Sequence, residues 1–307
     1  MSDTQDVTER CVGVEVSNSA LTAVCLDAGG QIVGTKRADI DFAEPASKQT
    51  IDFISGLEAD FGPFAKVGVA VPGLLSADRR KVAYSAHIPE ISGLELADQI
   101  ESATGKRALI ENDANAAAYG EFHLGAGRGA NNMFYATLGK GVGGAIVFDG
   151  NIWRGASGYA GEFGYIPVNS EGVRLEEVAS SANIIRRTRS RFHQDSTSAL
   201  VDLDEAKLTI SDIVSAAEAK DDFAKLMLER TGSYVGTGVA CVINLLNVER
   251  VIIGGEIMGG HHIILESIIN RARELSFLPS FNSTVIGAGE LGANAAAAGA
   301  GLLAREI

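Results

Sequence analysis

The stretch ENDANAAAYGE, residues Glu111–Glu121, is the most informative segment of the sequence. It follows the apolar run ALI and predicts a strand that ends at Glu111 and a helix of small residues that begins directly after it. A carboxylate at such a junction can point into a ligand site. A sugar hydroxyl is a poor nucleophile, so phosphoryl transfer to it benefits from an aspartate that accepts its proton, and Asp113 suits that role. The alternative is that Asn112 or Asp113 serves only as the N-cap of the helix, a common use of both residue types.

Strands and helices are predicted twice, in a similar order, on the two sides of this stretch. Before it, the pattern predicts an antiparallel meander of three strands between residues 11 and 37, a helix near 51–59, a strand at 67–71 and an amphipathic helix with Leu94, Leu96, Ala97 and Ile100. After it, the pattern predicts strands at 133–138, 144–148 and 251–255, helices at about 176–192 and 222–247, and an alanine-rich helix from Asn294. This repetition predicts two α/β halves that face a cleft.

Length and charge limit the function classes. The chain has 307 residues, which is long for a single core, so two domains of about 150 residues each are expected. The net charge of −13 opposes binding to a polyanion such as DNA.

The sequence predicts a cytoplasmic protein. The N-terminal residues MSDTQDVTER are polar and acidic and lack the apolar centre of a secretory signal. No apolar run approaches the ~20 residues that a membrane helix needs. Cys11, Cys25 and Cys241 are far apart within apolar runs, so they are expected to be small core residues rather than disulfide partners or metal ligands.

A glycine cluster in ATLGKGVGGAIVFDG, residues 136–150, separates two predicted strands. Backbone amides that no side chain covers can hold phosphate oxygens in such a turn, and Lys140 would add positive charge. The alternative is a simple hairpin whose glycines only provide the turn conformation.

Two glutamates after this cluster are candidate sugar ligands. Glu162 lies between glycines in GYAGEFGYIPV, and Glu176 opens a predicted helix. Each carboxylate could accept hydrogen bonds from sugar hydroxyls. For Glu176 the alternative is a favourable interaction with the positive end of its helix, which any acidic residue in the first turn makes.

Taken together and in this order, these segments resemble the ROK family (repressor, open reading frame, kinase) over nearly the whole chain. VGVAVPG at 67–73 matches the family's strand that ends in Pro-Gly, and AHIP at 86–89, with His87, matches the turn that follows. Residues 112–117 match the Asn-Asp-Ala-Asn-Ala-Ala motif, and residues 236–257 match the nucleotide-side helix and strand.

The resemblance implies a role for each matching residue. Asp113 corresponds to the catalytic base, and Glu15 corresponds to a carboxylate that could hold Mg²⁺ through water. The implied sugar contacts are Gly73, Asn112, Glu162 and Glu176. The implied nucleotide contacts are Ser17, Asn18, Ser19, Gly139, Lys140, Gly141, Gly254 and Gly255.

The resemblance also implies the fold and the ligands. It implies an actin-like, hexokinase-type pair of ribonuclease-H-like α/β domains around a cleft, with a small domain at 1–115 completed by a C-terminal helix at 292–307, and a large domain at 116–291. The implied cofactors are ATP and Mg²⁺, and the implied partners are a small sugar, a nucleotide and further copies of the chain. No nucleic acid or membrane partner is expected.

The chain departs from the family in its phosphate loops. The first loop is Asp-x-Gly-Gly-Thr in family kinases, but residues 15–19 are EVSNS here, so a carboxylate remains while the glycines are lost. The side chains of Ser17 and Asn18 can crowd a phosphate or donate hydrogen bonds to it. Lys140 replaces the usual threonine of the second loop, and its charge can compensate in part.

The chain also departs from the zinc site of many relatives, which combines one His and three Cys after the sugar loop. Tyr165 occupies the His position, and IPVNSEGVRL at 166–175 contains no cysteine, so we expect a compact loop without structural zinc. Tyr165 can donate a hydrogen bond to the sugar in place of the histidine.

Three functions are compared on these grounds. The leading hypothesis is a glucokinase-like enzyme that transfers phosphate from ATP to the 6-hydroxyl of glucose or an N-acetylhexosamine. The alternative is a non-catalytic sugar sensor with a degenerate phosphate loop. A ROK repressor would need a helix-turn-helix before the first strand, and the roughly ten residues that precede Cys11, together with the acidic charge, argue against one.

Overall fold

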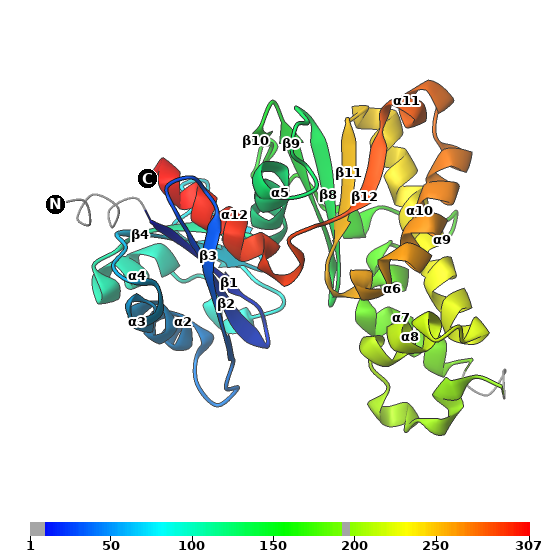
Figure 1. Ribbon diagram of the computed structural model, residues 1–307, viewed down its shortest axis with the longest axis horizontal. Helices are drawn as coiled ribbons and strands as arrows, with labels where there is room; N and C mark the ends of the chain where they lie inside the picture. Colours follow the sequence, from blue (N-terminus) through cyan, green and yellow to red (C-terminus); the bar gives the residue numbers. More distant parts are fainter. Residues whose placement is uncertain (1–9, 192–196) are drawn as a thin grey trace. The chain divides into compact units, whose positions relative to one another are not determined.

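A computed structural model describes residues 10–191 and 197–307 of the chain (Figure 1). The chain forms two compact units. The first contains the chain up to Gly129, Ile146–Ala160 and Glu290–Ile307, and the second contains Ala130–Ala145 and Gly161–Gly289. Each unit is built on a five-stranded sheet.

The first sheet has the strand order β3-β2-β1-β4-β7. Its strands are β1 (Cys11–Val16), β2 (Ala20–Leu26), β3 (Ile32–Asp39), β4 (Lys66–Val71) and β7 (Arg107–Asn112). Strands β1, β2 and β3 are antiparallel, which confirms the predicted meander, whereas β4 and β7 run parallel to β1. The short strands β5 (Leu74–Leu75) and β6 (Val82–Tyr84) form a separate hairpin.

Helices cover both faces of this sheet because alternate strand residues are apolar or small. On one face Val12, Val14 and Val16 of β1 join a core with α2 (Ala46–Gly56), α3 (Glu58–Phe61) and α4 (Leu96–Thr104). On the other face α12 (Ala295–Leu303) lies so close that a Cβ on Gly13 would be 1.8 Å from the carbonyl oxygen of Ala297. Helix α5 (Asp113–Leu124) packs against α12 in turn.

The second sheet has the strand order β10-β9-β8-β11-β12. Its strands are β8 (Met133–Leu138), β9 (Val142–Phe148), β10 (Asn151–Ile152), β11 (Arg250–Gly254) and β12 (Val285–Ala288). Strand β11 is parallel to both β8 and β12. The helices of the second unit are α6 (Glu176–Ala179), α7 (Ser181–Arg189), α8 (Ile210–Glu218), α9 (Asp222–Leu246), α10 (His261–Leu275) and α11 (Leu278–Ser283).

These two α/β units confirm the predicted fold class. Residues 116–129 and 146–160, which the sequence interpretation placed in the second domain, belong to the first compact unit. One expectation is wrong: Cys11 and Cys25 are buried, but Cys241 is exposed, because it lies on the outer face of α9 while Val242 and Ile243 face the core. Within the described ranges, no helix is long and apolar enough to cross a membrane.

Candidate functional site

The first unit gathers its candidate residues at one edge of its sheet. Strands β1, β4 and β7 are parallel neighbours, so their carboxyl ends lie together. Glu15 is near the end of β1, Gly73 follows β4, and Asn112 ends β7. This edge is where open α/β sheets commonly bind ligands. The geometry therefore brings Glu15, Gly73, Asn112 and Asp113 into one group.

Asn112 organises the start of α5. Its Oδ1 accepts a hydrogen bond from the amide of Asn115 at 3.1 Å, so Asn112 is the N-cap of the helix. Its Nδ2 donates to the carbonyl oxygen of Gly73 and to Oδ1 of Asp113, both at 3.1 Å. Gly73 itself has φ +145°, and a Cβ there would be 2.4 Å from the carbonyl oxygen of Tyr84, so only glycine fits.

Asp113 is the first residue of α5 and is partly buried. Its Oδ1 accepts both the Asn112 Nδ2 bond and a bond of 2.9 Å from the amide of Ala114, so Oδ2 is not needed to hold the helix end. Burial raises the pKa of Asp113 to about 6, while the amide of Ala114 and the charge of His87 oppose that rise. A carboxylate with such a pKa can accept a proton near neutral pH.

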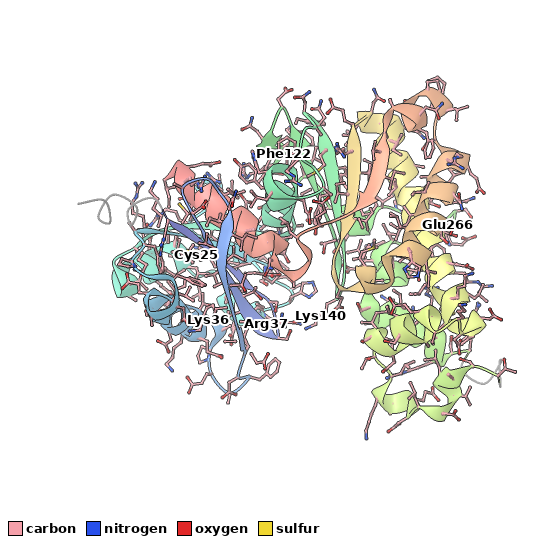
Figure 2. All side chains as sticks on the ribbon, viewed as in Figure 1. Cys25, Lys36, Arg37, Phe122, Lys140 and Glu266 are labelled. Atoms are coloured by element: carbon pink, nitrogen blue, oxygen red, sulfur yellow. The ribbon has the colours of Figure 1, made fainter. Side chains whose placement is uncertain are left out.

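Glu15 shares the electrostatic environment of Asp113. Burial, and then the negative charge of Asp113, raise the pKa of Glu15 to about 7, while Arg37 lowers it. The strand register explains the influence of Arg37, which Figure 2 labels: Glu15 pairs with Thr22, and Thr22 pairs with Arg37 on β3, so these side chains share one face of the sheet. The charge of Asp113 thus raises the proton affinity of Glu15, and a carboxylate in this situation suits a divalent cation.

The side chain of Ser17 closes the turn between β1 and β2. The hydroxyl oxygen of Ser17 accepts hydrogen bonds from the amides of Ser19, at 3.3 Å, and Ala20, at 3.0 Å. It also donates to the carbonyl oxygen of Ala20 at 2.9 Å. The amides of Ser19 and Ala20 therefore have an internal acceptor.

In the second unit, two glycine segments meet. The turn that joins β8 to β9 contains Gly139, Lys140 and Gly141, and Figure 2 labels Lys140 there. Gly254 of β11 pairs with Thr137 of β8. Gly255 has φ +97°, and a Cβ on it would be 2.3 Å from the carbonyl oxygen of Leu138. The predicted nucleotide residues of this unit are thus neighbours.

Behind this turn lies a contact that sequence patterns did not reveal. The carbonyl oxygen of Gly139 accepts a bond from the amide of Ser181 at 2.8 Å, and the Ser181 hydroxyl lies 2.5 Å from a carboxylate oxygen of Glu256. A carboxylate therefore stands beside the glycine turn, directly after Gly255.

The two candidate glutamates of the second unit are close enough to interact. Burial, and then the charge of Glu176, raise the pKa of Glu162. Glu176 begins α6, and its Oε2 accepts the amide of Val142 at 2.9 Å. Tyr165 is 59% exposed, and the guanidinium of Arg174 lies 4.6 Å from its ring centre, so the ring is engaged by Arg174. Its predicted bond to a sugar remains a prediction.

The segment that replaces the zinc region is a small hairpin. Pro167 and Arg174 form a bridge, and the amide of Val168 donates to the carbonyl oxygen of Val173 at 2.8 Å. Among the described residues, no group of three or more His, Cys, Asp or Glu side chains is arranged to hold a metal ion. Independence from zinc stays a prediction.

The ion pairs of the buried Glu111, at the junction of β7 and α5, could not be predicted from sequence motifs. Glu111 is 2% exposed and pairs with Arg154 at 2.5 Å and Arg79 at 3.6 Å. The sequence shows an acidic residue at the end of an apolar strand, but it does not indicate that Arg79 and Arg154 are its partners.

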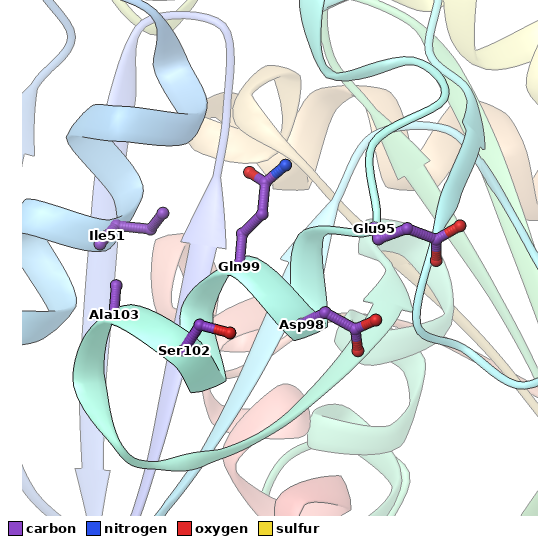
Figure 3. A pocket seen from close by; sticks show the side chains of 6 residues that line it. All are labelled: Ile51, Glu95, Asp98, Gln99, Ser102 and Ala103. Atoms are coloured by element: carbon purple, nitrogen blue, oxygen red, sulfur yellow. The ribbon is translucent and has the colours of Figure 1, made fainter.

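A shallow depression lies elsewhere on the first unit, between α2 and α4 (Figure 3). Its lining residues are Ile51, Glu95, Asp98, Gln99, Ser102 and Ala103. None of them is a candidate site residue, so this surface does not bear on the chemistry proposed below.

Comparison with known proteins agrees with this fold. The family model described as "ROK family" matches residues 11–307. A glucokinase from Halalkalibacterium halodurans is 33% identical over 275 residues, which cover 84% of this chain and 83% of that protein. A xylose repressor from Bacillus subtilis is 25% identical over 302 residues, covering 94% of this chain and 75% of the repressor.

A solved structure extends the likeness to three dimensions. The ROK family glucokinase from Streptomyces griseus, in complex with glucose and AMPPNP, superposes with a TM-score of 0.86 at 27% identity, covering 97% of this chain and 100% of the other. The fold is therefore the hexokinase-type pair of α/β units. The chain belongs to the ROK family.

Proposed function

We propose that this protein phosphorylates the 6-hydroxyl of a hexose, either glucose or an N-acetylhexosamine, with ATP as the donor. The observation that carries the proposal is that the carboxylate of Asp113 has a raised pKa and does not cap the helix. Asn112 takes over the N-cap, and burial raises the pKa of Asp113 to about 6. Asp113 is thereby suited to accept the proton of the hydroxyl as that oxygen attacks the γ-phosphorus of ATP.

The sugar would be held by hydrogen bonds to its other hydroxyls. In the first unit, Asn112 and Gly73 carry polar groups of the kind that bind sugar hydroxyls. In the second unit, Glu162 and Glu176 carry carboxylates that can accept hydrogen bonds from such hydroxyls. The glucokinase relatives support this role, since one of them is described in complex with glucose. Which hexose is preferred depends on the side chains that meet each hydroxyl, so the proposal names a class of sugar.

The nucleotide would use the glycines of the second unit. Gly139, Gly141 and Gly255 are partly or fully exposed at the carboxyl ends of β8 and β11, and Lys140 adds a positive charge. Gly254 is buried directly before Gly255. Glu15 is the residue that would hold Mg²⁺, whose charge would offset that of the phosphates. The raised pKa of Glu15 fits a carboxylate that lacks a full counter-charge.

A coupled assay over a panel of hexoses and N-acetylhexosamines, with ATP and polyphosphate offered separately, tests the proposal. We expect sugar phosphate with ATP and at least one of these sugars. No product from any pair after long incubation at high protein concentration would contradict it.

A second candidate is a non-catalytic sugar sensor. The closed β1–β2 turn favours it, because the amides of Ser19 and Ala20 already donate to Ser17 and are less available to a phosphate. The similarity to a xylose repressor also shows that relatives of this chain include regulators. Calorimetric sugar binding without any product would select this function over the kinase.

A further inference from the structure

We propose that Arg154, acting through the buried carboxylate of Glu111, positions Asp113 and is required for full turnover. The inference rests on the proposed role of Asp113 as the proton acceptor. It concerns two residues that belong to neither the sugar-binding nor the nucleotide-binding candidates, and both lie within the first unit.

Glu111 fastens the chain on both sides of Asp113. One of its oxygens, Oε1, accepts the amide of Asn112 at 3.0 Å and Nδ2 of Asn115 at 3.1 Å. These two residues flank Asp113 in the sequence. Glu111 is 2% exposed, so water has little access to take over either bond. The orientation of this one carboxylate therefore fixes the backbone from which Asp113 projects.

Arg154 sets that orientation. Its Nη2 donates to the other oxygen of Glu111, Oε2, at 2.5 Å. Arg79 also approaches Oε2, but its Nη1 stays 3.6 Å away and has no hydrogen-bond partner in the structure as described. A hydrogen bond fixes direction, whereas a charge at 3.6 Å mainly supplies attraction. Arg79 thus helps to neutralise the carboxylate, and Arg154 determines where it points.

Arg154 is itself held by a closed loop. It follows β10, and its carbonyl oxygen accepts the amide of Ala160 at 3.0 Å. Gly155, with φ +72°, makes the sharp turn that this closure needs. Two residues beyond Ala160, the chain reaches Glu162. The ion pair therefore links the backbone at Asp113 to the segment that leads to a candidate sugar ligand.

Removing the Arg154 guanidinium should affect chemistry more than sugar binding. Among the described residues, Arg154 gives Oε2 of Glu111 its one strong hydrogen bond, so without it Glu111 could rotate. Asp113 would then keep its charge but lose its exact placement. Misplacement of a catalytic group on the scale of 1 Å can cost about 10²-fold in rate.

The experiment compares Arg154→Met and Arg154→Lys with the control Arg80→Met, each measured for kcat, sugar KM and urea unfolding. Arg80 is a matched arginine: its side chain is 35% exposed against 32% for Arg154, and it also pairs with carboxylates, those of Asp98 and Glu101 on α4. We expect Arg154→Met to lower kcat on the order of 10-fold or more, with sugar KM within a factor of about three. Arg154→Lys, which keeps a charged donor, should recover most of the loss, and Arg80→Met should leave kcat unchanged.

The decisive measurement repeats Arg154→Met in the Asp113→Asn background. If Arg154 acts through Asp113, the second substitution should lower the residual turnover no further, while its effect on the unfolding midpoint persists. An equal fold-loss of kcat in both backgrounds, an unchanged kcat, or a loss confined to sugar KM would overturn the inference. If Arg154→Met does not fold, Arg154→Gln, which keeps an N–H donor, takes its place in the same comparison.

The two proposals fail in different ways. Near-normal turnover of Asp113→Asn alone, or no turnover in the unmodified chain, would refute the proposed function and this inference with it. Normal kcat in Arg154→Met, with Asp113→Asn inactive, would refute only the inference.

Discussion

Asn112 caps helix α5 and at the same time donates a hydrogen bond of 3.1 Å from its Nδ2 to Oδ1 of Asp113. The sequence left open which of the two residues caps the helix and which is available as a proton acceptor, and the structure assigns one task to each. Asn112 stabilises the helix end, and Asp113 is left as a partly buried carboxylate of raised pKa. The capping alternative holds for Asn112, and the proposed chemistry falls to Asp113.

Replacing Asp113 by Asn keeps the shape of the side chain but removes the proton acceptor. We expect turnover to fall ~10²-fold or more while sugar affinity stays within about tenfold, because the acceptor acts mainly in the transition state. A coupled assay and calorimetry measure the two effects. Asp222→Asn, in the first turn of α9, is the control and should change neither. Near-normal turnover would remove Asp113 from the mechanism.

Substitutions of Asn112 separate capping from sugar binding. Asn112→Ala should lower the free energy of unfolding by about 1 kcal/mol, whereas Asn112→Ser, which can still cap α5, should lose much less. Both variants lack the Nδ2 donor that reaches Gly73, so both should bind sugar more weakly. Urea unfolding and calorimetry test the pair. Equal destabilisation by Ala and Ser would argue against the capping role.

The raised pKa values of Glu15 and Asp113 make stability depend on pH. In the folded state they rise from 4.5 to about 7 and from 3.8 to about 6, so the folded protein binds these protons more tightly than the unfolded chain. Their stabilising contribution is complete below about pH 4 and is lost as the pH rises through 6 and 7. The free energy of unfolding of Glu15→Gln, measured relative to that of the unmodified chain, should therefore be higher at pH 8 than at pH 5.

Urea unfolding of both proteins at the two pH values measures this difference. Glu266→Gln, at an exposed position of α10 labelled in Figure 2, is the control and should leave the pH dependence unchanged. A Glu15→Gln variant with the same pH dependence as the unmodified chain would show that Glu15 titrates normally.

Lys140 is expected to serve the phosphoryl donor. Lys140→Ala should reduce turnover by a similar factor on every accepted sugar, because the lysine would interact with the phosphates of ATP. Sugar affinity, measured by calorimetry without nucleotide, should not change. Lys36→Ala, which removes an exposed lysine paired with Asp60, is the matched control. A loss that depends on the identity of the sugar would place Lys140 at the acceptor instead.

The hairpin at 166–175 leads us to expect folding and activity without zinc. Prolonged treatment with a chelator should leave the unfolding midpoint and the turnover unchanged, since no cysteine cluster is present in this segment to supply a structural site. One tightly held zinc per chain in elemental analysis would contradict this expectation.

Helices α8, α10 and α11 lie outside the helices predicted from the sequence. The first residues of α10 are His261 and His262. Its partner surface is set by Gly232 and Gly236, one turn apart on α9, where a Cβ would come within 2.6 Å of the carbonyl oxygens of Ile264 and Ile268. Glycine lowers helix propensity, so the local sequence does not indicate that Gly232 and Gly236 allow α10 to pack closely on α9. Only the folded chain reveals this packing.

The alternation of strands and helices, the junction at Glu111–Asp113 and the family could be predicted from the sequence, because apolar periodicity and short motifs are local properties of the chain. Which residues share a site could be read only from the folded chain. Glu111 and Arg154 form an ion pair although they are 43 positions apart. The charge of Asp113 raises the pKa of Glu15 because the strand order β1-β4-β7 brings the ends of these strands together. The physical reason is that burial and charge act through space, so pKa shifts and ion pairs depend on the path of the folded chain rather than on the order of its residues.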